Sequence, residues 1–327
     1  MPGKRNFDAQ LGALEALRGQ PAEECLEPLR KGLAQRNNFL VAKAADLARE
    51  FNLLQLTPEL LTSFDRFFSD AVKSDPQCWA KNSLSRALAA FEHSDAAVFL
   101  RGMKHIQLEP VYGGVSDSAG TLRATCALAL VQCRSLPEAD LLRHLVELFA
   151  DKDKSVRVEA AHAVENVNSL AAALVLRVRA ILGNDEPEVL GACYSGILQI
   201  EGTPAIPWVG KYVAEADEAA GEAALALAGT HKLEAFNILR EQLEAASDRW
   251  FRSVLLSAIA LTRQEVAVEF LFEQVKKESL LAEAAIEALL RAGLAEESIS
   301  QLEKAVAGSP RLQRVFRANR SSDSLRS

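Results

Sequence analysis

Apolar residues recur along the chain at helical spacing, in segments that resemble one another. The segments 118–132, 153–167, 186–200 and 248–262 each begin with a polar residue, continue with a large apolar residue, and then place small residues at helical spacing. Apolar residues spaced in this way lie on one face of a helix. The pattern therefore predicts the same kind of helix several times over, in a chain that is nearly all helical.

The repeat has a regular length and a regular small residue. Taking the large or apolar residue as an anchor, the intervals between successive anchors are 38, 43, 34, 33, 30, 32 and 30 residues. Seven residues later, which is about two helical turns, seven of the eight units have Ala or Gly. Because a small side chain lets two helix backbones approach, we expect neighbouring helices to press together there. The anchors are Val41, Trp79, Leu122, Val156, Val189, Ala219, Phe251 and Leu281, and the later positions are Ala48, Arg86, Ala129, Ala163, Gly196, Ala226, Ala258 and Ala288.

A second helical pattern lies in nearly every interval between anchors, so the repeated unit is a helix, a turn and a helix. A unit of about 30 residues cannot bury both of its faces alone and is stable only between neighbours. We therefore predict an all-α fold, a right-handed α-α superhelix (solenoid) of about eight helical hairpins, with the second helices on its inner surface. The predicted parts are a capping helix over 1–20, the repeats over 21–307, and a basic capping helix and tail over 308–327.

These residues resemble the HEAT repeats and, in the shorter later units, the HEAT-like repeats first described in phycobilisome lyases. The clearest match is 141–167, with Asp151 and Asp153 in the turn and Val156-Arg157 opening the second helix. The later units depart from the pattern: Leu190 stands in place of the base, and the units anchored at Ala219 and Leu281 lack it. The resemblance covers roughly 21–307. It implies a helical superhelix and says little about function, because such repeats serve many roles.

Charge and cysteine content narrow the class of protein. The chain has 327 residues and a net charge of −7, so the whole molecule repels polyanions, and generic binding to nucleic acid is disfavoured. No stretch holds 18 or more uninterrupted apolar residues, so no membrane span is expected. The five cysteines form no C-x-x-C pair, which fits reduced thiols. We expect a cytoplasmic, bacterial protein.

Motifs that carry catalysis, metals or cofactors are missing from the sequence. The five histidines are scattered without H-x-x-x-H spacing, and there is no G-x-S-x-G, G-x-G-x-x-G or G-x-x-x-x-G-K-S motif. Cys126 and Cys133 are seven residues apart, about 10 Å along a helix, which is too far to share a metal ion unaided. We expect no catalytic residue, no cofactor and no metal.

Five bases follow the anchors and form the first candidate for partner binding. They could line an inner groove as a basic row, or they could pair with turn aspartates of the same or adjacent repeats. The two arrangements look identical in sequence, and the resemblance favours the aspartate pairing. The bases are Lys43, Lys81, Arg123, Arg157 and Arg252.

Three other features leave the same choice between partner binding and packing. Residues 107–120 lengthen one interval to 43 and read as a loop; Tyr112 in it could belong to a partner-binding lip or pack on the neighbouring repeat. For the three tryptophans, we expect packing in preference to ligand recognition; they are Trp79, Trp208 and Trp250. For the basic segment 309–327, we expect a terminal cap in preference to an arm that binds acidic partners.

The functional hypothesis from sequence is a non-catalytic scaffold or adaptor that binds a protein partner on its concave face, as a monomer or weak dimer. Two alternatives come from the resemblance. A HEAT-like DNA glycosylase or DNA-binding protein would need clustered Lys and Arg on the inner helices. A tetrapyrrole lyase-like chaperone would need an open pocket with an acid or a reactive Cys, and none of the thiols stands in an activating sequence context.

Overall fold

The computed structural model describes residues 2–293 and 295–323. It is mostly helical, with helices α1 to α20 and one two-stranded sheet, so the prediction of an all-α fold is confirmed at this level. The chain divides into two compact units, Met1–Val167 (unit 1) and Asn168–Ser327 (unit 2). Among the described residues, no helix has both the length and the apolar content needed to cross a membrane.

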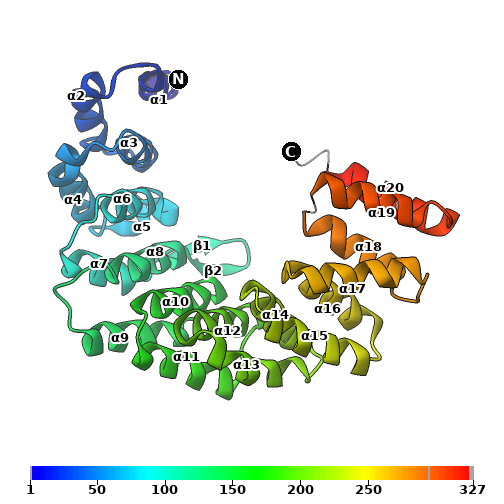
Figure 1. Cartoon of the computed structure of the whole chain (residues 1–327). Coiled ribbons are helices and arrows are strands. Elements are labelled where there is room, and N and C mark those ends of the chain that lie inside the picture. The colour runs from blue at the N-terminus through cyan, green and yellow to red at the C-terminus, as the bar shows by residue number, and fades with distance from the viewer. Residues whose placement is uncertain (1, 294, 324–327) are drawn as a thin grey trace. The chain divides into compact units, whose positions relative to one another are not determined.

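Unit 1 is a row of helical hairpins. Each of α3, α6, α8 and α10 packs on the next, and each also packs on a partner helix that precedes it in the chain (Figure 1). The helices are α1 (Pro2–Glu15), α2 (Ala22–Leu33), α3 (Asn38–Glu50), α4 (Thr57–Arg66), α5 (Ala71–Ser74), α6 (Trp79–Ala90), α7 (Ala96–Met103), α8 (Gly120–Leu130), α9 (Glu138–Glu147) and α10 (Lys154–Val167).

Unit 2 repeats the same arrangement. Helices α12, α14, α16, α18 and α20 pack in succession, and α11, α13, α15, α17 and α19 pair with them as hairpins. The helices are α11 (Leu170–Leu182), α12 (Pro187–Glu201), α13 (Ile206–Val213), α14 (Glu218–Gly229), α15 (Leu233–Ala245), α16 (Arg249–Leu261), α17 (Glu265–Lys276), α18 (Ala282–Arg291), α19 (Glu296–Val306) and α20 (Pro310–Asp323).

The small residues of the repeat lie where the helices meet. All seven Ala or Gly positions predicted for close packing are buried, among them Ala48, Ala163 and Ala258 with no exposed surface. The one exception to the small-residue rule, Arg86, is exposed. The spacing in the sequence therefore marks real helix contacts, and its exception is an exposed residue of α6.

The helix α20 covers the apolar end of the row in unit 2. Leu312 and Phe316 on its inner side are buried, while Arg311 pairs with Glu283 at 3.4 Å and Arg320 with Glu303 at 3.5 Å. These arginines are thus engaged with acidic residues of α18 and α19. The predicted tail falls partly on residues 324–327, which lie outside the described residues.

The sequence suggested a loop over 107–120, but this segment contains an antiparallel hairpin. Strand β1 (Leu108–Val111) pairs with β2 (Gly114–Asp117), with Glu109 opposite Ser116. The turn between them needs Gly113, whose φ of +88° is a conformation that residues with a side chain rarely adopt. Tyr112 lies at the tip and is fully exposed, so it does not pack on the neighbouring repeat.

Candidate functional site

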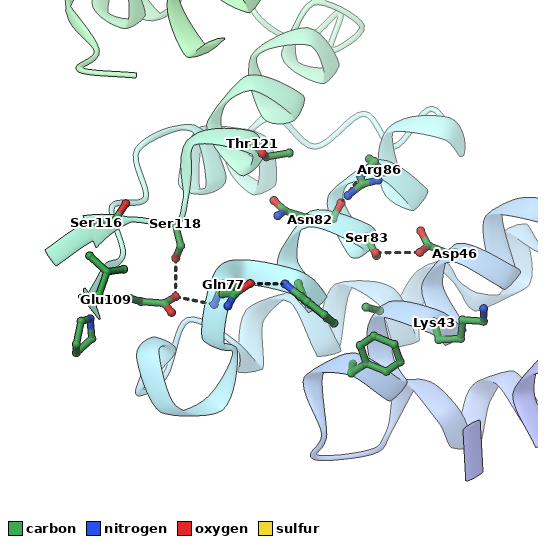
Figure 2. A pocket seen from close by; sticks show the side chains of 15 residues that line it. Lys43, Asp46, Gln77, Asn82, Ser83, Arg86, Glu109, Ser116, Ser118 and Thr121 are labelled. Atoms are coloured by element: carbon green, nitrogen blue, oxygen red, sulfur yellow. Dashed lines mark hydrogen bonds between the residues drawn. The ribbon is translucent and has the colours of Figure 1, made fainter. Parts of the chain in front are cut away.

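A hollow of about 790 Å³ opens on unit 1 between α3, α6, the start of α8 and the hairpin. Figure 2 shows the side chains that line it, with Lys43 and Asp46 from α3, Asn82, Ser83 and Arg86 from α6, and Glu109, Ser116 and Ser118 from the hairpin region. The complete lining is Phe39, Ala42, Lys43, Asp46, Gln77, Trp79, Asn82, Ser83, Arg86, Glu109, Pro110, Val111, Ser116, Ser118 and Thr121.

The carboxylate of Glu109 fastens the hairpin to the turn before α6. Its Oε1 accepts hydrogen bonds from Ser118 Oγ at 2.5 Å, from the backbone N–H of Gln77 at 2.6 Å and from Gln107 Nε2 at 2.7 Å. Burial by itself would raise the pKa of Glu109, but these three donors outweigh it and lower the pKa. The carboxylate is therefore charged at neutral pH and acts as a structural acceptor.

A buried ion pair lies at the start of α6, beneath this turn. Asp75 and Lys81 have no exposed side-chain surface, and Nζ of Lys81 lies 3.0 Å from Oδ2 of Asp75. The same carboxylate caps α6 by accepting from the backbone N–H groups of Ala80 at 2.9 Å and Lys81 at 3.0 Å. The ammonium also donates to the carbonyl of Phe67 at 3.1 Å. Buried charges persist only when they are paired and hydrogen-bonded in this way.

A second buried base holds the other end of the hairpin. Arg123 on α8 donates to Oδ2 of Asp117 at 2.6 Å, to both carboxylate oxygens of Asp151 at 2.7 and 3.0 Å, and to the carbonyl of His105 at 3.0 Å. Burial favours a higher pKa for Asp117, but hydrogen bonds from Gln107, Ala119 and Arg123 prevail and lower its pKa. The hairpin is thus tied to α8 and to the turn before α10.

The turn before α6 has an unusual backbone that positions Trp79. Gln77 and Cys78 are consecutive residues with positive φ, at 60° and 53°. Such residues cost about 1–3 kcal/mol each and persist only when their surroundings hold them. Here the turn aims the Gln77 side chain at Trp79, whose Nε1 donates to Oε1 of Gln77 at 3.1 Å. The indole stays 44% exposed and packs against Phe39 with ring centroids 5.0 Å apart.

Two buried polar atoms of the hollow have no hydrogen-bond partner in the described residues, Oδ1 of Asp46 and Oδ1 of Asn82. Oδ1 of Asp46 lies 4.0 Å from Nη2 of Arg49 in an ion pair, and Oδ2 of Asp46 accepts from Ser83 Oγ at 3.2 Å. Arg86 uses Nε to reach the carbonyl of Asn82 at 3.2 Å, and no ion pair of its guanidinium occurs within the described residues. Unsatisfied acceptors beside an open donor are what a bound polar ligand would satisfy.

The structure places the six sequence candidates in different surroundings. Lys43 lines the hollow, with Nζ 3.2 Å from Glu15, and Tyr112 stands at the hairpin tip. Lys81 and Arg123 lie beneath the surface in the ion pairs described above, which is the structural alternative considered for the bases. Arg157 and Arg252 donate to turn carbonyls, of Asp151 and Ala246, each at 2.6 Å. Lys81 and Arg123 therefore show the aspartate pairing that the resemblance favours, and not the alternative of an open basic row.

Trp79 and Arg86 were not predicted to share a site, although the sequence marks both residues as exceptions to the repeat. Both depart from their repeat positions, where a buried anchor and a small residue are expected, and both line the hollow. Trp79 and Trp250 are about half exposed, so neither is a core residue, although Trp79 packs on Phe39 of the preceding repeat. Trp208 is half-buried and stacks with the Arg177 guanidinium 4.2 Å from its ring centroid.

The cysteines and the potential metal ligands do not form a reactive site within the described residues. All five thiols are buried, and burial raises the pKa of every one of them, to about 11 for Cys78 and about 12 for Cys193. A thiol with a raised pKa is a poor nucleophile. Among the described residues, no three His, Cys, Asp or Glu side chains come together as a metal site.

A comparison of the sequence with protein families and with curated proteins finds no match. The resemblance to HEAT-like repeats accordingly depends on the residues of this chain alone.

Proposed function

We propose that this chain is a HEAT-like binding protein without catalytic activity, whose hollow in unit 1 holds an extended segment of a partner protein. The observation that carries the proposal is the half-exposed Trp79, held by the Gln77 side chain beside the Oδ1 atoms of Asp46 and Asn82, which accept no hydrogen bond within the described residues. An exposed indole next to unsatisfied polar atoms is typical of a recognition surface.

A polypeptide backbone matches the polar atoms of the hollow. Its N–H groups supply donors for the oxygens of Asp46 and Asn82, whose terminal torsions turn easily. Its carbonyl groups accept from the guanidinium of Arg86. Between these contacts, the indole of Trp79 and the adjoining ring of Phe39 offer an apolar surface for one large side chain of the partner.

The wall of the hollow is prepared for binding by its supports. The ion pair of Asp75 with Lys81 and the contacts of Arg123 and Glu109 fix α6, α8 and the hairpin to one another. A binding surface that is already fixed loses less conformational entropy when a ligand docks. These networks would therefore increase affinity without touching the partner.

The contacts of the bases and the burial of the cysteines disfavour the two alternatives from sequence, DNA binding and a lyase-like role. DNA binding requires basic side chains that are open to phosphates, but Lys81 and Arg123 are engaged with aspartates. A lyase-like role with a reactive thiol requires a lowered pKa, whereas burial raises the pKa of each cysteine. We therefore favour the protein-binding function over both.

The finer architecture is part of the proposal. Within each unit, successive helical hairpins pack on one another, as they do in a right-handed α-α superhelix. We propose that each unit is a segment of such a superhelix, and that the protein acts in the bacterial cytoplasm.

The test is selection of peptides from a random phage-displayed library on the immobilised full chain, followed by fluorescence polarisation with the selected peptides. Because a tryptophan hot spot contributes about 2 kcal/mol or more, Trp79→Ala is expected to weaken binding about 30-fold. Arg86→Ala should also weaken it.

Trp250→Ala is the matched control, since Trp250 is an equally exposed tryptophan of unit 2. It should leave the affinity within about twofold of wild type. The proposal fails if no peptide is selected, or if the selected peptides bind Trp79→Ala and Arg86→Ala as tightly as wild type.

A further inference from the structure

The helix α11 in unit 2 turns large aliphatic side chains toward solvent. Leu170, Leu174, Val178, Ile181 and Leu182 are between 57% and 76% exposed. The opposite side of the same helix, which packs on α12, is formed mainly by alanines, with Ala172, Ala173, Leu176 and Ala180 buried. The usual distribution, with large apolar residues inside and polar residues outside, is reversed in this helix.

The polar residues of α11 do not interrupt this apolar row. In 170–182, a range that the structure describes completely, the only charged residues are Arg177 and Arg179, and both are partly buried. Arg177 forms an ion pair with Glu201, with Nε 2.7 Å from Oε1, and Arg179 pairs with Asp185. The exposed faces of other helices in unit 2 differ: α15, for example, exposes Arg240, Glu241 and Glu244.

The exposed aliphatic residues are spaced symmetrically along the helix. Leu170, Leu174, Val178 and Leu182 form a single row at intervals of four residues, about 18 Å long at 1.5 Å per residue. The row has its centre at residue 176. If two copies of α11 lie antiparallel, Leu170 of each copy meets Leu182 of the other, and Leu174 meets Val178. A two-fold contact requires this self-complementary placement.

From this arrangement we propose that α11 is the centre of a homodimer interface, in which two chains pack their α11 helices antiparallel. Large exposed apolar patches mark interaction surfaces on soluble proteins. A specific interface covers about 800 Å² on each partner, so the row supplies the apolar core and neighbouring polar residues supply the rim. The dimer depends on unit 2 alone and is independent of the hollow in unit 1.

A membrane surface is the other apolar environment that such a helix could enter, but the charges of α11 favour a second copy. Helices that lie in the bilayer interface carry lysines and arginines that are available to anionic lipids. Here the two arginines are already paired with Glu201 and Asp185, and Arg177 also stacks on Trp208. The helix therefore offers an apolar row without a free basic flank.

Sedimentation velocity of the full chain over a range of concentrations tests the dimer. Wild type should show a monomer–dimer equilibrium. Leu174→Glu and Val178→Lys should each raise the dimer dissociation constant at least tenfold, because the new charge faces an aliphatic side chain of the other copy. Val266→Glu, a change at an exposed position of α17, is the matched control and should leave the equilibrium unchanged. Circular dichroism establishes that each variant is folded.

The antiparallel register has its own test. In a mixture of the Leu174→Glu and Val178→Lys chains, Glu at 174 of one chain lies opposite Lys at 178 of the other, while the second contact keeps Val178 against Leu174. The mixture should therefore recover dimers that neither variant forms alone. A wild-type chain that stays monomeric, variants that dimerise like wild type, or a mixture that does not recover would each overturn the proposal. Flotation of monomeric wild type with phosphatidylserine vesicles, lost in Leu174→Glu, would overturn it in favour of a membrane.

Discussion

Replacing Lys81 with Met removes one partner of the buried ion pair at the start of α6. The methionine fills a similar volume, but the carboxylate of Asp75 loses its counter-charge and the carbonyl of Phe67 loses its donor. Breaking a buried pair from one side costs about 3–5 kcal/mol. Asp75 keeps the N–H groups of Ala80 and Lys81 and the amide of Asn38 as donors, so we expect Lys81→Met to cost about 3 kcal/mol, at the lower end of that range.

The assay is urea denaturation followed by circular dichroism, with the thermal midpoint as a second measure. A loss of about 3 kcal/mol corresponds to a fall of roughly 6–12 °C for a unit of this size. The double variant Asp75→Asn/Lys81→Met should cost about 1–3 kcal/mol less than the sum of the two single variants, because the residues act as a pair.

Lys104→Met is the control for this experiment, since Lys104 is exposed at the end of α7. It should change the free energy of unfolding by no more than about 0.5 kcal/mol. If Lys81→Met costs less than about 1 kcal/mol, or if the single-variant costs simply add, then Asp75 and Lys81 do not form the paired support described above.

Three further predictions address the hairpin, the helix contacts and a helix end. Hydrogen bonds hold the pKa of Glu109 below its usual value of about 4.3. The charged carboxylate therefore stabilises the fold above about pH 4.3, and this stabilisation is lost as the pH falls below that value. The difference in unfolding free energy between wild type and Glu109→Gln should shrink between pH 5 and pH 3, and a constant difference would contradict this. Gly102→Ala should destabilise the protein by about 1–3 kcal/mol, since the added Cβ would lie 2.4 Å from Sγ of Cys126. The control Gly12→Ala, with open space around the added Cβ, should be neutral or stabilising. Equal thermal midpoints for the two variants would exclude tight packing at Gly102. Glu92→Gly should raise the free energy of unfolding by about 0.5–1 kcal/mol, because Glu92 has a φ of 52° at the end of α6; a loss of stability in urea denaturation would argue against this.

The helical repeat could be predicted because each contact depends on a local pattern. Ala48, Ala129 and Ala163 were expected at helix contacts and are buried there, since spacing along one helix decides which side chains share a face. The hairpin was missed because the helical period dominates its surroundings, although Gly113-Gly114 between two short runs containing valine is a recognised turn signal.

The hollow could not be predicted, because it depends on contacts between residues far apart in the sequence. Glu109 meets Gln77 and Ser118, and Arg123 meets Asp151; pairings of this kind follow from the packed fold and not from spacing. The positions of the basic residues show why spacing in the sequence does not decide which side chains line the hollow. Lys43 and Lys81 follow their anchors at the same distance, yet one lines the hollow and the other is buried beneath it.

The measurement that most directly tests the central claim is hydrogen–deuterium exchange of the full chain with and without a selected peptide. Bound peptide is expected to slow exchange in the segments that form the hollow, 77–86 and 107–118, and to leave exchange in unit 2 unchanged. Slowed exchange in unit 2 alone, or no change in either hollow segment at a saturating peptide concentration, would contradict it.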